Sequence, residues 1–358
     1  MNWINNAIPL RDASFKQQAL ERQSQLTKPS GSLGKLEEIA VRLADLQQTA
    51  KPAADNISIT VFAGDHGIAE EGVSAFPQEV TVQMVMNFVQ GGAAISVLAQ
   101  QLGASFEVVD TGILTELPAQ NSLLIQRAGA GTKNSLHHEA MTQDELKTAL
   151  QAGYDAVERA LEKKAEVFIG GEMGIANTTS ATVLYCALLG LKPEKVAGAG
   201  TGLDAKGIDH KKNIVAGVLK KHKVCGDDAL AWLRCTGGFE IAALTGAYIR
   251  AAQSGLPVLV DGFISSVAAL CAVKIQPEIN DYLFFSHISA EKGHRKVLDK
   301  LQKEFDLEGS RQKALLDLEM RLGEGSGAAV AAGLLRSACA LHNNMATFAE
   351  AAVAGQKN

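Results

Sequence analysis

Apolar residues recur at spacings of three and four within residues 14–48, for example at Leu36, Ile39 and Leu43. This spacing places apolar side chains on one face of a helix. The stretch TKPSGSLGK, residues 27–35, contains a proline and two glycines, which interrupt a helix. The pattern therefore predicts two helices near the N-terminus.

After residue 56, short runs of β-branched and aromatic residues alternate with longer helical stretches. The runs are ISITVFAG, SFEVVDTG, AEVFIGG, KVAGAG, LPVLVDGF and DYLFFSH. Strands that alternate with helices are typical of a parallel sheet covered by helices. Several runs end in Gly or Asp, at the carboxyl edge where open α/β sheets bind ligands. We expect an α/β fold with its binding site at that edge.

The chain becomes helical again after His294, with an amphipathic pattern over residues 296–316 and an apolar one over residues 328–349. We expect the helices at both ends of the chain to pack together as a small helical domain beside the sheet. The predicted division is residues 1–52 for the N-terminal part of the small domain, residues 53–295 for the large α/β domain, and residues 296–358 for the C-terminal part of the small domain.

The overall charge argues against nucleic acid or membrane partners. A net charge of -5 and a pI near 5.9 leave no basic surface to neutralise a phosphate backbone. The five cysteines are scattered and never form a CxxC pair, which disfavours a disulfide framework or a zinc site. The N-terminus is polar where a signal peptide is apolar, and apolar runs such as GAAVAAGLL are too short to span a membrane. We expect a cytoplasmic protein that acts on small molecules.

The segment VFIGGEMGIANTTSATVL, residues 167–184, is a candidate phosphate site. A strand ends in two glycines, Glu172 follows, and Asn177, Thr178 and Thr179 open a helix as caps. Free N–H groups at such a helix N-terminus bind anions. An ordinary capped turn between a strand and a helix fits this pattern equally well.

A second glycine loop, GAGTGLDAKGIDHKK, covers residues 198–212. Gly200 and Gly202 would let the backbone approach a ligand closely, and Lys206, Lys211 or Lys212 could add a cation. The loop lacks a full GxGxxG with a downstream acid, and it has no GK[ST]. A surface turn with solvated lysines is the alternative interpretation.

The segment RLGEGSGAA, residues 321–329, places one carboxylate, Glu324, between two glycines and after the apolar Leu322. Flexible flanks can hold such a carboxylate in a pocket, where desolvation raises its pKa toward the range of a general base. A solvated glutamate in a turn is the alternative.

Asp65 and His66 follow the first predicted strand and suggest a metal site or a hydrolase that acts on a phosphorylated sugar. No further ligands stand at zinc spacing, and no Gly-x-Ser-x-Gly turn supplies a nucleophile. A structural hydrogen-bonding role is therefore favoured. Phe76 and Met84 offer an apolar wall for a ligand, or else simple core packing. The segment SHISAEKGH, residues 286–294, should line the same edge of the sheet.

Seven segments occur in one order along nearly the whole chain: KPSGSLGKLE, GDHG, SAFPQEVT, GGEMGIANTT, GGFEIAALTGAYIRAAQSGLPVLVDGF, SHISAEKGH and RLGEGSGAA. Together they resemble the nicotinate-nucleotide:dimethylbenzimidazole phosphoribosyltransferases of cobalamin assembly. The resemblance implies a homodimer, each chain having a Rossmann-like large domain that binds the nucleotide and a small helical domain. It also implies transfer of the ribose phosphate of nicotinate mononucleotide to 5,6-dimethylbenzimidazole, with no cofactor and no metal.

The same resemblance implies roles for individual residues. Glu324 would be the catalytic base. The ribose phosphate would be held by Glu172, Gly174, Lys211 and the loop from Gly200 to Gly202, and the benzimidazole slot would be lined by Phe76, Met84, Met173 and Leu322.

The predicted slot departs from the family pattern at two positions. Some relatives carry a small serine and a glutamine where this chain has Phe76 and Met84. A narrower, more apolar slot could shift the preferred base among dimethylbenzimidazole, benzimidazole, adenine and phenolics. A protein that binds the nucleotide without turning it over is a further alternative.

Overall fold

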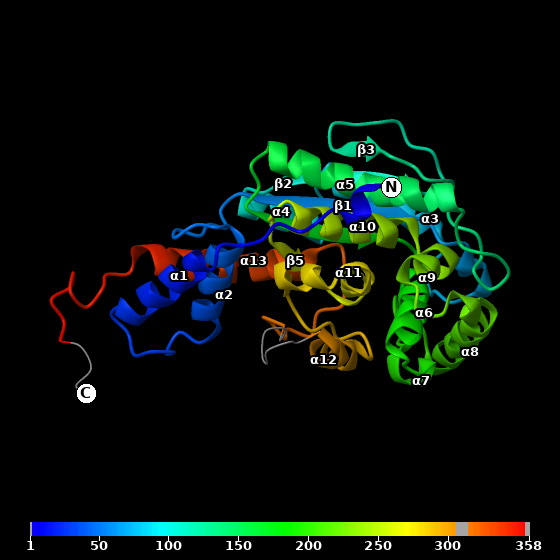
Figure 1. Ribbon diagram of the computed structural model, residues 1–358. Coiled ribbons are helices and arrows are strands. Elements are labelled where there is room, and N and C mark those ends of the chain that lie inside the picture. The colour runs from blue at the N-terminus through cyan, green and yellow to red at the C-terminus, as the bar shows by residue number, and fades with distance from the viewer. Residues whose placement is uncertain (1, 306–313, 355–358) are drawn as a thin grey trace.

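A six-stranded parallel sheet forms the centre of the molecule in the computed structural model, which describes residues 2–305 and 314–354 (Figure 1). The strands are β1 (Ile57–Gly64), β2 (Ser105–Gly112), β3 (Leu123–Ile125), β4 (Val167–Met173), β5 (Val258–Val260) and β6 (Leu283–Phe285). Their order is β3-β2-β1-β4-β5-β6, and each neighbouring pair is parallel. The strand order reverses between β1 and β4, as in dinucleotide-binding folds. This confirms the predicted α/β fold with a Rossmann-like sheet.

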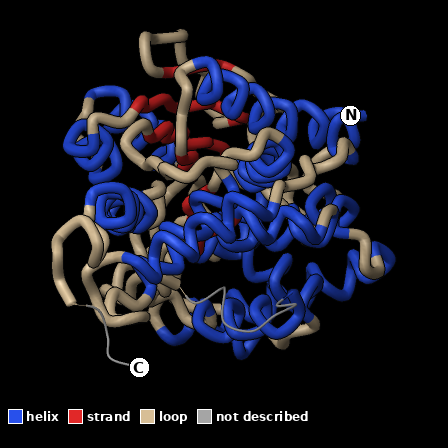
Figure 2. Tube along the Cα trace, turned by 60° about the vertical axis from the view of Figure 1, so that its left-hand side comes forward, coloured by secondary structure: helices blue, strands red, loops and turns tan. Residues whose placement is uncertain are grey.

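Helices surround the sheet on its two faces and at its ends (Figure 2). The α-helices are α1 (Ala13–Gln25), α2 (Lys35–Leu46), α3 (Glu79–Gln90), α4 (Ala94–Leu102), α5 (Gln143–Glu162), α6 (Asn177–Leu189), α7 (Pro193–Val196), α8 (Ala205–His222), α9 (Ala229–Thr236), α10 (Phe239–Gln253), α11 (Phe263–Ile275), α12 (His294–Phe305) and α13 (Ser326–Asn344). The short 3₁₀ helices of the described chain are η1 (Asn2–Asn5), η2 (Gly67–Glu71), η3 (Lys223–Cys225) and η4 (Pro277–Tyr282).

Two predictions about strands were wrong. The run KVAGAG forms the end of α7 and a loop, because β4 pairs directly with β5 and leaves no place for a strand between them. Its small residues instead allow the loop after α7 to lie close to Glu291, since a Cβ added at Gly198 would lie 2.1 Å from Glu291 Oε1. Strand β3 was missed because it has only three residues at the edge of the sheet.

The helices after His294 also differ from the sequence prediction. Helix α12 ends at Phe305, and residues 306–313 of the predicted helix lie outside the described residues. Leu316, predicted to be helical, instead exchanges backbone hydrogen bonds with Ser286 and Ile288 beside β6. Extended backbone at the sheet edge thus replaces the last part of the predicted helix.

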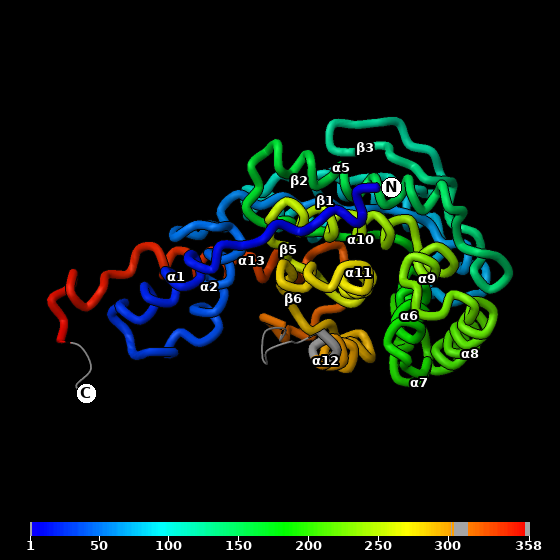
Figure 3. The backbone as a smooth tube through the Cα atoms, viewed as in Figure 1, coloured from blue at the N-terminus to red at the C-terminus, as the bar shows by residue number. Residues whose placement is uncertain are grey.

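Helices near the two ends of the chain, α1, α2 and α13, lie side by side at one end of the sheet (Figure 3). Helix α2 packs against both α1 and α13. Arg22 on α1 donates hydrogen bonds to the carbonyl oxygens of His342, Asn343 and Met345, at the end of α13, where carbonyl groups have no partner within the helix. The boundaries proposed at residues 52 and 295 stay a prediction.

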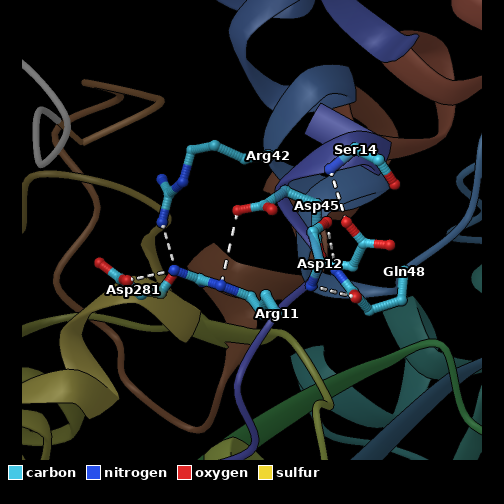
Figure 4. A network of polar contacts seen from close by, with 7 residues as sticks. All are labelled: Arg11, Asp12, Ser14, Arg42, Asp45, Gln48 and Asp281. Carbon is cyan, nitrogen blue, oxygen red and sulfur yellow. Dashed lines mark hydrogen bonds and ion pairs between the residues drawn. The ribbon is translucent and has the colours of Figure 1, made fainter. Parts of the chain in front are cut away.

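Arg11 ties the N-terminal helices to the sheet side of the molecule (Figure 4). Its guanidinium lies 2.5 Å from Asp281 Oδ2 and 3.6 Å from Asp45 Oδ2, while Arg42 donates to the Asp281 carbonyl oxygen at 3.0 Å. Partly exposed ion pairs of this kind contribute about 0–1 kcal/mol each, so they orient the helices more than they stabilise them.

The first residues pack on the large sheet unit before the chain crosses to α1 (Figure 1). Trp3 Nε1 donates to Gln151 Oε1 at 2.9 Å, and Gln253 Nε2 donates to the Trp3 carbonyl oxygen at 2.8 Å. Ile4 is fully buried. Contacts from α5 and α10 therefore anchor the N-terminus, which the sequence pattern did not indicate.

Within the described residues, the stretch Glu79–Leu102 is long and apolar enough to cross a membrane by length and composition alone. In the structure it is two helices, α3 and α4, and both contact strands of the sheet. A single stretch of this kind is weak support for a membrane helix, because core helices pass the same test. The absence of a membrane partner stays a prediction.

Helices α5 and α10 cross closely because glycines stand at their contact. A Cβ added at Gly153 would lie 1.8 Å from the Ala243 carbonyl oxygen, and one added at Gly246 would lie 2.1 Å from the Leu150 carbonyl oxygen. Both distances are too short for non-bonded atoms, so the helices would have to separate.

We predict that Gly246→Ala destabilises the protein by about 1–3 kcal/mol or more, because the added methyl group overpacks the crossing. The matched control is Gly333→Ala on α13, where an added Cβ meets nothing within 4 Å. That change should be neutral or stabilise by about 0.4–1 kcal/mol. Urea unfolding of both variants measures the difference, and equal midpoints would contradict the packing argument.

Candidate active site

The segment 323–325 forms a tight turn that begins α13 and carries Glu324. Gly323, Glu324 and Gly325 have φ angles of 83°, 66° and 91°. A non-glycine residue with positive φ is uncommon and costs on the order of 1–3 kcal/mol, so its surroundings must impose the conformation. Glu324 is only 5% exposed. The alternative of a solvated turn glutamate is therefore wrong.

The Glu324 turn packs against the backbone of β4. A Cβ added at Gly171 would lie 2.1 Å from the Glu324 carbonyl oxygen, and one added at Gly323 would lie 2.5 Å from Glu172 Oε1. The Glu324 N–H also donates to the Glu172 carboxylate. Glycine at residues 171 and 323 therefore lets the C-terminal turn reach the carboxyl end of the central sheet.

The Glu324 carboxylate lies in a buried environment beside the first turn of α4. It accepts a hydrogen bond from the Ile95 N–H, while its Oε2 atom has no hydrogen-bond partner among the described residues. Burial raises the pKa of Glu324 to about 7, the Ile95 N–H opposes this shift, and the negative Asp261 adds to it. At neutral pH such a carboxyl group can exchange a proton readily.

Lys211 and the second glycine loop meet the first turn of α6. Lys211 is fully buried on α8 and donates to Thr178 Oγ1 at 2.7 Å. A Cβ added at Gly200 would lie 2.8 Å from Thr178 Oγ1 and 3.4 Å from Lys211 Nζ. Burial lowers the pKa of Lys211 to about 8. A buried ammonium, a hydroxyl and a close backbone loop are groups that can bind an anion, and we call this set, Lys211, Thr178 and Gly200, the cradle.

Only one of the three candidate lysines points into this cradle. Lys206 is exposed, and Lys212 pairs with Asp209 at 2.7 Å on the surface of α8. Glu291, from the segment after β6, accepts the Gly200 N–H at 3.1 Å and raises the pKa of Lys211 against the effect of burial. The segment 286–294 thus contacts the cradle through Glu291, at the edge of the sheet where the sequence predicted it.

Glu172 and Asn177 form a buried pair between the cradle and the Glu324 turn. Asn177 Nδ2 donates a short hydrogen bond to Glu172 Oε2. Burial raises the pKa of Glu172 well above its usual range, and the nearby carboxylates of Glu240 and Asp261 act in the same direction. The pair places an amide and a carboxyl group side by side, and both can hydrogen-bond to hydroxyl groups.

The predicted helix caps at residues 177–179 were wrong. Helix α6 begins at Asn177 itself, its N-cap position is Ala176 with φ 76°, and no side chain caps its first turn. The reason is that β4 continues to Met173, so the turn falls on residues 174–176. Asn177 and Thr178 turn instead toward Glu172 and Lys211.

The residues predicted for the base slot lie on three different segments. Phe76, before α3, and Leu322, before the Glu324 turn, are exposed by 50% and 58%. Met84 on α3 and Met173 at the end of β4 are partly buried against the core. Half-exposed apolar side chains offer surface that a flat apolar ligand would cover.

Hydrogen bonds connect two of these segments to the Gly200 loop. Ser74 Oγ lies 3.1 Å from Thr201 Oγ1, and Arg321 Nη1 donates to the Gly200 carbonyl oxygen at 3.2 Å. The predicted cradle and the predicted slot are therefore neighbours.

Two of the predicted glycines have other surroundings. A Cβ added at Gly174 would lie 2.4 Å from the Gly64 carbonyl oxygen, so this glycine allows β1 and β4 to approach beyond their last pair. Gly202 has φ 125° and open space around it, and its conformation rather than a close contact requires glycine.

Asp65 and His66 are part of the buried scaffold. His66 is fully buried between Glu240, 2.7 Å from its Nε2, and Ser180, 3.0 Å from its Nδ1. Asp65 Oδ2 accepts the Leu114 N–H at 2.8 Å. Among residues 2–305 and 314–354, no group of three His, Cys, Asp or Glu side chains is placed to hold a metal ion. The favoured structural role of Asp65 and His66 agrees with these contacts.

Sequence reasoning missed Asp261, which follows β5 and is buried. Its two carboxylate oxygens accept the N–H groups of Gly325 at 3.1 Å and Ala328 at 3.0 Å. The only signal was that the run LPVLVDGF contains an aspartate directly after its apolar residues. Ile95 was likewise not assigned to the site, because it contacts Glu324 from a segment distant in sequence.

We predict that Gly171→Ala lowers activity far more than other glycine substitutions do, because the new Cβ displaces the Glu324 turn. Gly103→Ala is the control, since Gly103 has φ 61° but an added Cβ there meets nothing within 4 Å. The control should cost about 1–2 kcal/mol of stability from backbone strain and leave turnover per folded molecule unchanged. Similar turnover in both variants, measured after correction for the folded fraction by circular dichroism, would argue against this contact.

Comparisons with known proteins agree with the fold. A family model described as phosphoribosyltransferase matches residues 8–353. The chain is 54% identical over 355 residues to the nicotinate-nucleotide–dimethylbenzimidazole phosphoribosyltransferase of Pseudomonas putida (strain W619), and the match covers 98% of each chain. It is 55% identical over 356 residues to the enzyme of the same name from Pseudomonas fluorescens (strain Pf-5), covering 99% of this chain and 98% of the relative.

Solved structures give the same result. The crystal structure of CobT from Thermus thermophilus superposes with a TM-score of 0.89 at 43% sequence identity, covering 96% of this chain and 100% of that one. Both the sequence relatives and the structural neighbours extend over nearly the full length of the chain. The chain therefore belongs to the nicotinate-nucleotide:dimethylbenzimidazole phosphoribosyltransferase family.

Proposed function

We propose that this protein transfers the ribose 5-phosphate group of nicotinate mononucleotide to 5,6-dimethylbenzimidazole, with Glu324 as the general base. The C1'–N bond to nicotinate breaks, a new C1'–N bond to the azole forms, and the products are nicotinate and α-ribazole 5'-phosphate. The observation that carries the proposal is the buried Glu324 carboxylate, whose Oε2 is unpartnered among the described residues, next to an anion cradle at the sheet edge.

The reaction needs one proton acceptor and no acid at the leaving group. Nicotinate leaves from a positively charged pyridinium, so its departure neutralises the ring without protonation. The attacking azole must lose its N–H proton, and Glu324, with a pKa of about 7, can accept it. General-base help of this kind contributes roughly 10²–10⁴-fold. Attack on the face of C1' opposite the departing pyridinium inverts the anomeric centre and produces the α-anomer.

We assign the nucleotide to the cradle formed by Lys211, Gly200 and the first turn of α6. The Lys211 ammonium and the free N–H groups at the start of α6 would bind the phosphate. Glu172 and Asn177 lie between that cradle and Glu324, where they would hydrogen-bond the ribose hydroxyls. The loop from Gly200 to Gly202 and the turn at Gly174 would close around the sugar phosphate.

We assign the acceptor base to the slot formed by Phe76, Met84, Met173 and Leu322. A flat apolar heterocycle would cover the exposed faces of Phe76 and Leu322, at roughly 25 cal/mol for each Å² removed from water. The aromatic and thioether side chains favour dimethylbenzimidazole, while benzimidazole, adenine or a phenolic would compete for the same slot. A phosphosugar hydrolase that uses Asp65 and His66 is disfavoured because both residues are buried.

The deciding experiment is incubation of the purified protein with nicotinate mononucleotide and a panel of azoles and phenolics. Release of nicotinate together with a new nucleoside phosphate supports the transferase. Release of nicotinate and free ribose phosphate without an acceptor, lost on chelation, would indicate a metal-dependent hydrolase. Nucleotide binding without any nicotinate release would indicate a protein that binds the nucleotide without turning it over. The relative kcat/KM values rank the acceptors.

We also propose that the protein acts in the cytoplasm as a homodimer on small-molecule substrates. The dimer is supported by the surface formed by residues 79–102, in which Glu79 is the only charged residue and a third of the most apolar window is buried. An uncharged surface that the single chain leaves uncovered suits contact with a second copy.

We predict that Glu324→Gln lowers kcat by roughly 10²–10⁴-fold and leaves nucleotide affinity nearly unchanged, because the amide cannot accept the azole proton. The base must be ionised, so wild-type kcat/KM should fall as the pH decreases through about 7. Steady-state kinetics on both sides of that pH and calorimetric binding of nicotinate mononucleotide test both points. Near-wild-type turnover in this variant would show that Glu324 is not the base.

We predict that Lys211→Met raises the nucleotide Kd by roughly 10–100-fold, since a hydrogen bond between charged groups contributes about 1.5–3 kcal/mol. Lys211 is protonated below its pKa of about 8, so kcat/KM for the nucleotide should fall as the pH rises through about 8. The control Lys212→Met removes a surface lysine that pairs with Asp209 and should have little effect. Equal nucleotide affinities in the two variants would exclude Lys211 from the phosphate site.

A further inference from the structure

The Asp261 carboxylate accepts hydrogen bonds from the beginning of α13. Asp261 is the first residue after β5, and its side chain is 1% exposed. Oδ2 accepts the Gly325 N–H at 3.1 Å and Oδ1 accepts the Ala328 N–H at 3.0 Å. Both N–H groups belong to the start of a helix, where backbone donors have no partner within it. One carboxylate thus bonds to the residue directly after Glu324 and to the helix that follows.

The Glu324 turn needs such support because its backbone is strained. The three residues from Gly323 to Gly325 all have positive φ, and Glu324 itself is not a glycine. A residue keeps this conformation only where the surrounding contacts over-determine it. Gly171 contacts the Glu324 carbonyl oxygen, and Glu172 accepts the Glu324 N–H. Asp261 adds a third contact, through the next N–H in the chain.

We propose that Asp261 is a positioning residue, which holds the Glu324 turn in its left-handed conformation and thereby keeps the Glu324 carboxylate directed toward the substrate site. Asp261 contacts no atom assigned to substrate and acts through Glu324 alone. This inference rests on the proposed role of Glu324, and it adds a residue that the motif around Glu324 does not include.

A histidine completes the support. His287, at the end of β6, lies with Nδ1 3.8 Å from Asp261 Oδ1 and is buried with it. A Cβ added at Gly327 would lie 2.1 Å from His287 Nδ1 and 2.9 Å from Asp261 Oδ1. The start of α13 therefore packs directly against this pair. Burial raises the pKa of Asp261, and His287 opposes this shift. His287 thereby favours the ionised carboxylate, which accepts the two hydrogen bonds.

The charged groups around Glu324 come from four elements. Glu172 at the end of β4 accepts the Glu324 N–H, and Glu240 on α10 lies near Glu172. Asp261 after β5 adds to the raised pKa of Glu324, and His287 after β6 faces Asp261. The Ile95 N–H on α4 stabilises the ionised Glu324 carboxylate. Removing the Asp261 charge should therefore lower the pKa of Glu324, whereas loss of a purely structural residue would leave that pKa in place.

The test is Asp261→Asn, which keeps one acceptor oxygen and removes the charge. We expect kcat to fall about 10–100-fold, the Kd of nicotinate mononucleotide to stay within about twofold, and the acid limb of kcat/KM to move to lower pH. The matched control is Asp228→Asn, another helix-capping aspartate, which accepts the Ala231 N–H at 3.1 Å at the start of α9. It should leave all three quantities unchanged. If Asp261→Asn does not fold, Asp261→Ser keeps one acceptor in a smaller side chain and carries the same expectation.

Carboxyl ¹³C NMR of the labelled protein separates this inference from the proposed function. The Glu324 resonance, identified by its loss in Glu324→Gln, should titrate at lower pH in Asp261→Asn than in the wild type. If that titration does not move, or if kcat and nucleotide affinity fall together, Asp261 does not act through Glu324 and the inference fails. If kcat falls and the titration moves in Asp261→Asn while Glu324→Gln retains turnover, the positioning role stands and the general-base assignment fails.

Discussion

The backbone contact between Gly171 and the Glu324 turn is the constraint on which the rest of the site depends. Residue 171 lies on β4 in the middle of the sheet, and the absence of a side chain there lets the Glu324 carbonyl oxygen lie against that strand. The turn that opens α13 is fixed at the carboxyl edge of the sheet as a result. Glu172, the next residue along β4, accepts the Glu324 N–H from the same turn, so one strand holds both the N–H and the carbonyl group of Glu324.

Burial then gives the two charged ends of the site their chemical character. It raises the pKa of Glu324 to about 7 and lowers the pKa of Lys211 to about 8, so each group titrates near neutral pH. The two groups come from different parts of the chain, Glu324 from the start of α13 and Lys211 from α8. Glu172 and Asn177 lie between them. A nucleotide with an anionic phosphate, together with a second substrate that must lose an N–H proton, matches this arrangement.

Local patterns in the sequence predicted much of this organisation and failed where distant contacts decide. Five of the six predicted strand runs contain strands of the sheet, because β-branched residues and the following glycines act locally. KVAGAG has only one β-branched residue and lies in α7 and a loop close to Glu291. Leu316, expected to be helical, lies in extended backbone beside β6. The predicted caps at residues 177–179 failed because β4 continues to Met173 and α6 begins at Asn177, so the N-cap position falls on Ala176.

The sequence by itself determined the fold class, the alternation of strands and helices, and the residues able to carry the chemistry, because these depend on side-chain type and short spacing. Only the tertiary structure decided which of three lysines is buried, which carboxylates are desolvated, and which residue hydrogen-bonds to the Glu324 turn. Those properties depend on segments far apart in the chain, such as Gly171 with Glu324, meeting at one edge of the sheet. Desolvation and hydrogen-bond geometry arise only when that meeting takes place.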